Sequence, residues 1–337
     1  MNVPFKDVHI AFISGNHMAG DAIMSIFNQK SRLRRGPEGD PNIYITGLLG
    51  QHAVVHTLSP IGSPGSTSLV ITLHHMKRSF PNLRVLIVVG HATGAPDITA
   101  LPNSDIRLGD VVVGVPTAKN AAGVKVINYI DDITQQTVLR APQNFLLDAL
   151  ARVHKDNSPD GAASISEYVD DLIKSGEAPW LVDHGIDYRR PEQATDRLFR
   201  TGYKHVKEKT CWEEPCTDCD TSEVVRREAR AHRNPVVHLG QIAAFPAGVE
   251  SPALRDRVKA EAGSICIEGD MTCLSASSPP VFAIRGISDY GDSHNNPMWA
   301  RYACLTAAAL ARQVLLGISK EEIAVQKRLV EDYGGDW

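Results

Sequence analysis

Residues 281–296 read Val281-Phe-Ala-Ile-Arg-Gly-Ile-Ser-Asp289-Tyr-Gly-Asp-Ser-His-Asn-Asn296, and this stretch says most about the fold. A short apolar run comes first, and a loop rich in Gly, Asn and Asp follows it. Apolar runs of this length bounded by turn residues are typical of buried strands. In open α/β sheets, ligands bind in the crevice outside the carboxyl ends of the strands. The pattern therefore predicts that Ser288 and Asp289 stand at a strand end that faces a ligand.

A carboxyl group held at such a strand end can protonate a leaving group, which is general acid catalysis. Asp289 is therefore the first candidate for a catalytic residue, and Ser288 beside it is a candidate for substrate binding. The alternative is that Asp289 only caps the loop or the helix that follows. This stretch alone supports both interpretations.

The composition of the chain limits its partners and its location. It has 337 residues, of which 43% are hydrophobic, and a formal net charge of −4. It lacks the clustered Lys and Arg with interleaved aromatic residues that mark a nucleic-acid footprint. No apolar stretch approaches the ~18 residues of a membrane span, and residues 1–7 lack the pattern of a signal peptide. Because six cysteines do not make a disulfide scaffold in a chain this long, we expect a cytoplasmic protein without a membrane or nucleic-acid partner.

Apolar runs and helical patterns alternate along most of the chain. The expected strands span residues 8–14, 43–47, 53–58, 84–89, 111–115, 124–129, 236–245, 264–267 and 281–285. The expected helices span residues 65–80, 143–154, 254–262, 298–316 and, at the end of the chain, 320–330. Residues 155–235 are rich in charge, Pro and Gly, which indicates an insertion with a short helix at 165–174. The alternation predicts one α/β domain over residues 1–337 with a largely buried mixed sheet.

Two further segments have features of ligand-binding loops. Ser66 and Thr67 open an expected helix, where free backbone N–H groups favour an anion such as phosphate; simple N-capping is the alternative. Gly90 and His91 begin a loop after a buried strand, and a glycine there lets a ligand approach the backbone closely. All four residues are therefore candidates for substrate binding.

Two polar segments add candidates of a different kind. His17 lies in the loop after the first expected strand, where it would serve as a general base or a hydrogen-bond donor. Glu268 and Asp270 follow the strand at 264–267, and carboxylates there can accept hydrogen bonds from paired sugar hydroxyls. Exposure of these carboxylates at the surface is the alternative.

Three cysteines and a histidine fall close together in the sequence, namely His205, Cys211, Cys216 and Cys219. A structural zinc ion normally takes four N or S ligands. The C-x2-C pair is present, but a second pair exists only if His205 and Cys211 supply it. A zinc site and an acidic loop with free thiols both remain open, and we assign no metal ligands.

Common enzyme motifs are absent: the chain has no G-x-S-x-G, P-loop, G-x-G-x-x-G or H-E-x-x-H sequence. Other segments follow one another in a distinctive order: Phe80-Pro-Asn-Leu-Arg84, Asp105-Ile-Arg-Leu-Gly-Asp-Val-Val-Val113, Ala141-Pro, Cys216-Thr-Asp-Cys-Asp220, Pro235-Val-Val-His-Leu-Gly240-Gln-Ile-Ala, Arg255-Asp-Arg257, Ile284-Arg-Gly-Ile-Ser-Asp-Tyr290, and Asp292-Ser-His-Asn-Asn296 with Trp299, Tyr302 and Ala303. In this order the chain resembles the nucleoside phosphorylase and nucleosidase superfamily, most closely its fungal branch, from about Val8 to Leu316.

The resemblance implies a three-layer α/β fold with a mixed, mostly buried sheet flanked by helices. It also implies a small-molecule substrate, cleavage of an N-glycosyl bond and a homo-oligomer. In the family, the aspartate that matches Asp289 protonates the departing base while phosphate or water attacks the sugar. Phosphate would then be a co-substrate, and no cofactor is expected.

The ligand-binding segments depart from the family pattern. Gly90-His-Ala-Thr-Gly94 stands where G-I-G-G-G is usual, so side chains replace two glycines of the phosphate loop. Asp270, followed by Met271, stands in for a glutamate of the ribose-binding E-M-E-A motif, and His17 stands where L-P-L-E has its glutamate. Phe245 falls in a segment that is usually Ser-Gly-Asn. A site built for hydroxyl groups rejects ligands that lack them, whereas an apolar wall discriminates only weakly between ligands. These changes therefore predict a ligand more apolar than a nucleoside.

Three functions therefore remain open. The first is cleavage of a glycosyl bond, as a phosphorylase or nucleosidase. The second is a different reaction on an apolar substrate, such as a cyclisation or a cycloaddition in fungal secondary metabolism, with Asp289 and His17 orienting that substrate. The third is ligand binding without catalysis.

Overall fold

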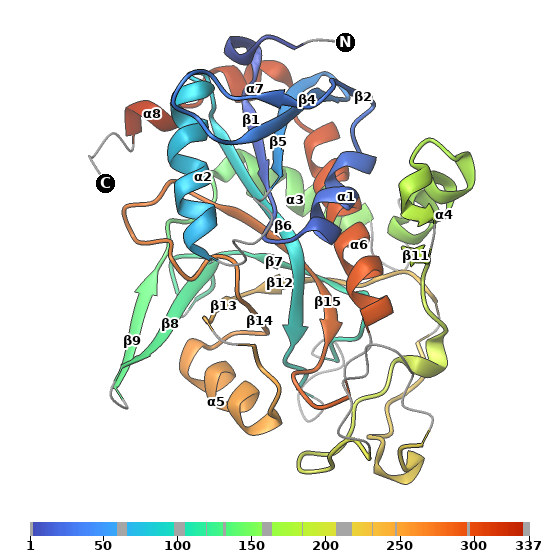
Figure 1. The fold of residues 1–337 in the computed structure, drawn as a ribbon. Helices are drawn as coiled ribbons and strands as arrows, with labels where there is room; N and C mark the ends of the chain where they lie inside the picture. Colours follow the sequence, from blue (N-terminus) through green and yellow to red (C-terminus); the bar gives the residue numbers. More distant parts are fainter. Residues whose placement is uncertain are drawn as a thin grey trace.

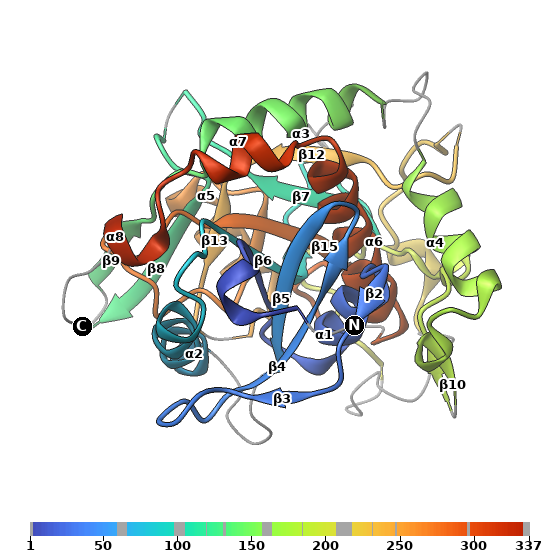
Figure 2. The ribbon, with the colours of Figure 1, turned by 90° about the horizontal axis from the view of Figure 1, so that it is seen from above.

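A mixed β-sheet of thirteen strands runs through the middle of the molecule, with α1, α3 and α6 together on one side and α2 and α5 on the other (Figures 1 and 2). The computed structural model describes residues 3–58, 66–97, 105–118, 120–130, 133–156, 164–183, 185–206, 218–230, 232–246, 248–294 and 297–332. The expected α/β fold, a mixed and mostly buried sheet flanked by helices, is confirmed.

The strands of the sheet are β1 (Ile10–Ile13), β2 (Gln29–Lys30), β3 (Arg34–Arg35), β4 (Ile43–Leu49), β5 (His52–Leu58), β6 (Val85–Gly94), β7 (Val111–Gly114), β8 (Val124–Ile130), β9 (Ile133–Val138), β12 (Val237–Gly240), β13 (Ile242–Ala244), β14 (Cys266–Glu268) and β15 (Phe282–Asp289). A separate ribbon joins β10 (Val182–Asp183) to β11 (Ile186–Asp187). The helices are α1 (His17–Ser25), α2 (Ser66–Ser79), α3 (Asn144–Asp156), α4 (Ile165–Ser175), α5 (Pro252–Ala262), α6 (Pro297–Leu316), α7 (Lys320–Ala324) and α8 (Leu329–Asp332). Short 3₁₀ helices are Phe5–Asp7, Pro179–Leu181, Gln193–Thr195 and Thr221–Glu223.

The long strand β6 organises the centre of the sheet. It pairs in parallel with β1 over its first half and with β15 along most of its length, while β14 joins its end in the antiparallel direction. Every residue of β1 is buried, as are the first six of β6, because continuous runs of Val, Ile and Leu have apolar side chains on both faces. The carboxyl ends of β6 and β15 therefore lie side by side in a rigid core.

Strand β15 contains a bulge next to its carboxyl end. Ile287 pairs with Ala92, but Asp289 pairs with Thr93, so Ser288 is the extra residue. In a regular strand, neighbouring side chains point to opposite faces, whereas a bulge bends the strand and changes the direction of its side chains. The bulge explains why the side chains of Ser288 and Asp289 contact each other.

Helix α6 packs directly along β15 (Figure 1). A Cβ atom added at Gly286 would lie only 1.9 Å from the backbone oxygen of Ala303. Glycine at 286 and a small residue at 303 thus allow the two backbones to touch. The position of the strand end is fixed by this contact.

Several local features differ from the expectation. Gly90 and His91 were expected to begin a loop, but β6 continues through both residues to Gly94, because it pairs there with β15 and β14. Residues 236–245 form two strands instead of one, because β12 pairs with β7 whereas β13 pairs with β8 and β14. The strand β9 was not expected, since Thr134-Gln-Gln-Thr137 gives it a polar centre. Residues 320–330 form α7 and the start of α8 with a break between them, and α7 begins with a capping box at Ser319.

Salt bridges fasten the insertion to the sheet. The Arg230 guanidinium donates to both oxygens of Asp110, at 2.6 and 2.7 Å, and His238 Nε2 lies 2.9 Å from Asp110 Oδ2. Burial acts to raise the pKa of Asp110, but hydrogen bonds from Arg230 and His238 outweigh it and hold the pKa well below its usual range. Asp110 directly precedes β7, so its carboxylate joins residues 230–238 to the sheet.

Acidification is expected to destabilise the protein through His56, which is fully buried in β5. Burial lowers the pKa of His56 from 6.5 to about 4, and only a hydrogen bond with the Phe12 carbonyl opposes this. The unfolded chain therefore binds more protons, so stability is full above pH 6.5 and falls as the pH drops towards 4, by about 3 kcal/mol. Urea unfolding at a series of pH values measures this loss.

The matched variants for this prediction are His56→Gln and His74→Gln, since His74 is exposed on α2. His56→Gln should remove the part of the pH dependence that His56 contributes, about 3 kcal/mol between pH 6.5 and 4, whereas His74→Gln should retain it. An unchanged slope in His56→Gln would contradict the assignment.

No single helix among the described residues is long and apolar enough to cross a membrane. Helix α6 and residues 320–331 meet the length and composition criteria only as a pair, and that pair is bent by 94°.

Candidate functional site

Asp289 is the last residue of β15, and neighbouring groups hold its half-buried carboxylate in place. The Thr93 hydroxyl and the Gly291 N–H donate to Oδ1, at 2.7 and 2.9 Å. The Ser288 hydroxyl donates to Oδ2 at 2.7 Å. Because each carboxylate oxygen accepts two hydrogen bonds, Oδ1 is satisfied and Oδ2 keeps a position for a proton or a ligand.

His91 extends this arrangement by one more hydrogen bond. Its Nδ1 lies 3.0 Å from Ser288 Oγ, which also lies 3.2 Å from the Ala92 carbonyl oxygen. Ser288 has one proton to donate, and the shorter contact to the charged Asp289 oxygen is the stronger one. The His91 Nδ1–H then donates to Ser288, which gives a chain from His91 through Ser288 to Asp289.

A buried ion triad lies against Gly90, the residue before His91. The Arg285 side chain is completely buried, and it donates to Glu268 Oε2 and Asp270 Oδ2, both at 2.6 Å. The backbone N–H groups of Asp270 and Met271 donate to Glu268. Burial raises the pKa of Glu268 to about 7, against the opposing effect of Arg285. The Asp270 side chain stays 18% exposed, so one carboxylate of the triad can meet a ligand.

Glycines make room for this triad. A Cβ atom at Gly90 would lie 2.1 Å from Arg285 Nη1, and one at Gly15 would lie 1.8 Å from Asp270 Oδ1. The loop after β1 and the centre of β6 therefore press against the ion pair. Gly90, expected to contact a ligand, contacts Arg285 and Asp270 in the structure.

His91 connects the triad to Asp289 electrostatically. Burial lowers the pKa of His91, while the charges of Asp270 and Asp289 act to raise it. The imidazole is therefore neutral at physiological pH. The structure brings together Asp289, Ser288, His91, Gly90 and Asp270.

Of the other predicted residues, Phe245 and Met271 meet the triad only through their backbone N–H groups, which donate to Glu268. His17 is exposed at the start of α1. Phe245 is buried against Tyr129 in the smaller apolar cluster, with ring centroids 5.4 Å apart. Met271 is fully buried in the main core. Ser66 and Thr67 begin α2, but their side chains lie outside the described residues.

Sequence reasoning missed three residues of this site. Arg285 carried a signal, because a single charged residue in an apolar strand is buried only when it is paired. Thr93 stood inside a segment that was recognised only for its glycines. Asp292 is buried, and both burial and the charge of Asp289 raise its pKa to about 6; nothing in the sequence marked it.

The cysteine segment is described in part. Cys211 and Cys216 lie outside the described residues, whereas His205 and Cys219 lie within them. Cys219 is buried, and its Sγ lies 3.6 Å from Nδ1 of His294. His294 was not among the residues considered with the cysteines.

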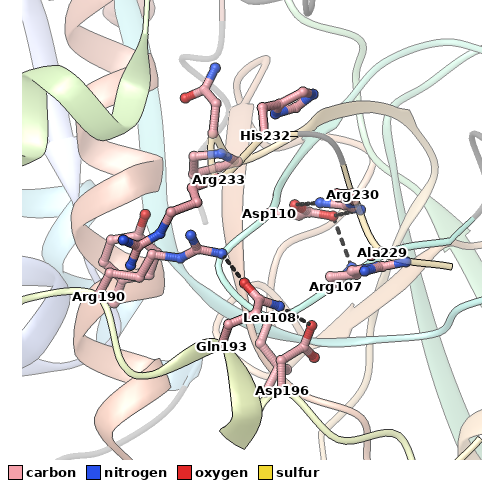
Figure 3. A pocket seen from close by; sticks show the side chains of 13 residues that line it. Arg107, Leu108, Asp110, Arg190, Gln193, Asp196, Ala229, Arg230, His232 and Arg233 are labelled. Atoms are coloured by element: carbon pink, nitrogen blue, oxygen red, sulfur yellow. Dashed lines mark hydrogen bonds and ion pairs between the residues drawn. The ribbon is translucent and has the colours of Figure 1, made fainter. Parts of the chain in front are cut away.

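A cavity of about 180 Å³ lies between the insertion and the sheet (Figure 3). Arg107, Arg190, Arg230, Arg233 and Tyr302 contribute to its lining, as do the carboxylates of Asp110 and Asp196. Figure 3 shows Arg230 paired with Asp110, and Arg190 reaching Gln193, which in turn reaches Asp196. A second cavity of about 320 Å³ is lined by Phe199, Arg255 and Lys259, among others. Neither cavity is lined by Asp289 or by another predicted site residue.

The cavity in Figure 3 offers mostly hydrogen-bond donors. Nε and Nη1 of Arg190 and the hydroxyl of Tyr302 are buried without a hydrogen bond among the described residues. Arg107 and Arg230 are already paired with Asp105 and Asp110. The remaining donors suit a small anion or ordered water.

No protein-family model matches the chain. A nucleotide-binding leucine-rich repeat (NLR)-like protein of Hyaloscypha variabilis is 30% identical over 295 residues, which are 86% of this chain and 27% of that protein. The chain thus spans about a quarter of the length of this relative.

Solved structures of two kinds of enzyme are similar to the whole chain. The 5'-methylthioadenosine/S-adenosylhomocysteine nucleosidase of Neisseria meningitidis has a TM-score of 0.52 at 12% identity, with 92% of this chain and 99% of that chain covered. Futalosine hydrolase of Helicobacter pylori has a TM-score of 0.52 at 11% identity, with 93% and 99% covered. The MTA/SAH nucleosidase of Streptococcus pneumoniae has a TM-score of 0.52 at 13% identity, with 92% and 100% covered. This chain therefore has the α/β fold of these nucleosidases.

Proposed function

We propose that this protein cleaves the N-glycosidic bond of a nucleoside, with Asp289 as the acid that protonates the departing base. The observation that carries the proposal is the position of Asp289 at the carboxyl end of β15, where Ser288 links it to His91, together with the partly exposed Asp270 held by Arg285. The reaction needs one group to protonate the base and another to bind the sugar hydroxyls. These two carboxylates suit the two tasks.

Asp289 has the contacts that an acid at this position needs. Oδ1 is held by Thr93 and Gly291, so the orientation of the carboxyl group is fixed. Because Asp289 is charged in the free protein, Oδ2 takes up a proton when the nucleoside binds and then passes it to the base. After the proton has left, the Ser288 hydroxyl stabilises the resulting carboxylate and His91 holds Ser288 in place.

Asp270 suits the binding of the sugar. The Arg285 guanidinium holds its Oδ2, and the remaining acceptor positions are available to hydroxyl donors. Arg285 is itself fixed by Glu268, so Asp270 is oriented before a substrate arrives. Fixing polar groups in advance lowers the reorganisation needed in the transition state.

The polar character of these groups favours glycosyl cleavage over a reaction on an apolar substrate. The expected apolar wall depended on Phe245. Its side chain packs inside the smaller apolar cluster. The exposed part of Asp270 and the free position on Asp289 instead match a ligand with hydroxyl groups and a basic nitrogen.

A panel of purine and pyrimidine nucleosides, including 5'-thio derivatives, tests the proposal. We expect release of the free base from at least one member, followed by chromatography, with water or phosphate as the attacking group. Reactions with and without phosphate distinguish the two. Absence of base release from every nucleoside under both conditions would contradict the proposal.

A second candidate function is ligand recognition within a larger protein. It is favoured by the NLR-like relative, in which the matching region is about a quarter of the length. In that case a nucleoside would raise the melting temperature without any release of base, because a ligand that binds only the folded state stabilises it. The same panel, followed by thermal unfolding and by chromatography, separates the two functions.

A further inference from the structure

His205, Cys219 and His294 form a cluster of potential metal ligands. One nitrogen or sulfur atom from each residue lies within 4.8 Å of the other two. Cys219 and His294 are buried, and His205 is half-buried. The cluster joins two parts of the insertion to the loop that follows β15. The fold thus brings Cys219 and His294, which are 75 positions apart in the sequence, into contact.

The distance between Cys219 and His294 suits a tetrahedral zinc ion. Zinc lies about 2.3 Å from a thiolate sulfur and about 2.0–2.1 Å from an imidazole nitrogen, so tetrahedral angles place sulfur and nitrogen about 3.6 Å apart. The observed separation between Cys219 Sγ and His294 Nδ1 is 3.6 Å. An ion can therefore bind these two atoms without a change in their spacing.

The surroundings of His294 prepare its Nδ1 atom for a metal. Nε2 lies 3.3 Å from the Tyr203 carbonyl oxygen, so Nε2 carries the proton and Nδ1 presents a lone pair towards Cys219. The ring also stacks on Phe199, with centroids 3.7 Å apart, and on Tyr203 at 5.4 Å. Metal-binding histidines usually have such a carbonyl partner for their second nitrogen.

We propose that His205, Cys219 and His294 bind one zinc ion, which fastens the insertion to the loop after β15. One thiolate and two imidazoles are soft and borderline donors that favour zinc over magnesium or calcium. These three side chains supply three positions of a tetrahedral zinc ion, and water takes the fourth. The backbone N–H of His205 donates to Ser293 Oγ at 2.9 Å, so the insertion and the loop after β15 already meet here. The alternative is a thiol–imidazole hydrogen bond with no metal.

Metal analysis of the full chain, purified without chelators, tests the proposal. We expect about one zinc per chain, and we expect replacement by cobalt to give the charge-transfer band of a thiolate–cobalt bond. Cys219→Ser should weaken zinc binding at least tenfold and reduce that band. Cys273→Ser changes an exposed cysteine that is not part of the cluster, so it should retain both properties.

A conservative variant keeps the test valid if Cys219→Ser folds poorly. His205→Cys should still bind zinc and should give a stronger thiolate–cobalt band, whereas His205→Ala should bind zinc at least tenfold more weakly. The proposal is wrong if the wild-type chain holds no zinc and gives no cobalt band. It is also wrong if Cys219→Ser leaves both the zinc affinity and the band unchanged.

Discussion

Asp289→Asn is expected to lower kcat for release of the base by about 10²- to 10⁴-fold, the usual contribution of a general acid. The amide retains the shape of the side chain and can still accept hydrogen bonds from Thr93 and Gly291. It has no proton to give to a leaving group at neutral pH. In the proposed mechanism Asp270 binds the sugar, so KM should change far less than kcat.

Asp292→Asn is the matched control for this prediction. Asp292 is buried, and its burial and the charge of Asp289 raise its pKa to about 6. It is therefore the other residue that could hold a proton near this strand end. If Asp289 is the acid, Asp292→Asn should reduce kcat by less than about tenfold. A larger loss in Asp292→Asn than in Asp289→Asn would transfer the role of acid to Asp292. Near-ultraviolet circular dichroism checks that both variants are folded.

Arg285→Met is expected to lower the free energy of unfolding by about 3–5 kcal/mol, because it leaves buried carboxylates without their partner. Arg285 is completely buried and lies 2.6 Å from both Glu268 and Asp270. Methionine fills much of the volume, so the loss reflects charge more than packing. Urea unfolding measures it.

Two further variants show whether the unpaired charge is the cause. Adding Glu268→Gln to Arg285→Met should recover part of the loss, since it removes the most deeply buried negative charge. Arg189→Met breaks an exposed ion pair with Asp187 and should change the free energy of unfolding far less than Arg285→Met does. An Arg285→Met protein as stable as Arg189→Met would show that the triad contributes little.

The sequence was sufficient to predict the strands and helices that form the core. Strands β1, β6 and β15 are continuous apolar runs, and α6 is a long Ala-rich segment, so burial alone decides their structure. The polar strand β9 had no such signal. The division of residues 236–245 depends on pairing partners that are far away in the sequence, and local patterns do not encode them.

The candidate site was predictable only in part for the same reason. Asp289 and Ser288 follow an apolar run in the sequence. The glycines at 90 and 94 made Gly90 and His91 candidates for ligand binding. The bulge at Ser288, which brings the two side chains together, depends on pairing with β6. The cluster of Cys219 and His294 depends on contact between the insertion and the loop after β15. The ion pair between Asp270 and Arg285 could be recognised only from the three-dimensional structure.

The direct contact between Gly286 and Ala303 limits how this protein can evolve. Any side chain at position 286 would separate the helix from the strand and displace Asp289 at the strand end, so we expect substitutions of Gly286 to be selected against. We expect variation instead in the loops that surround the strand ends. Changes in substrate preference among relatives should therefore accumulate in those loops, while the strand–helix pair remains constant.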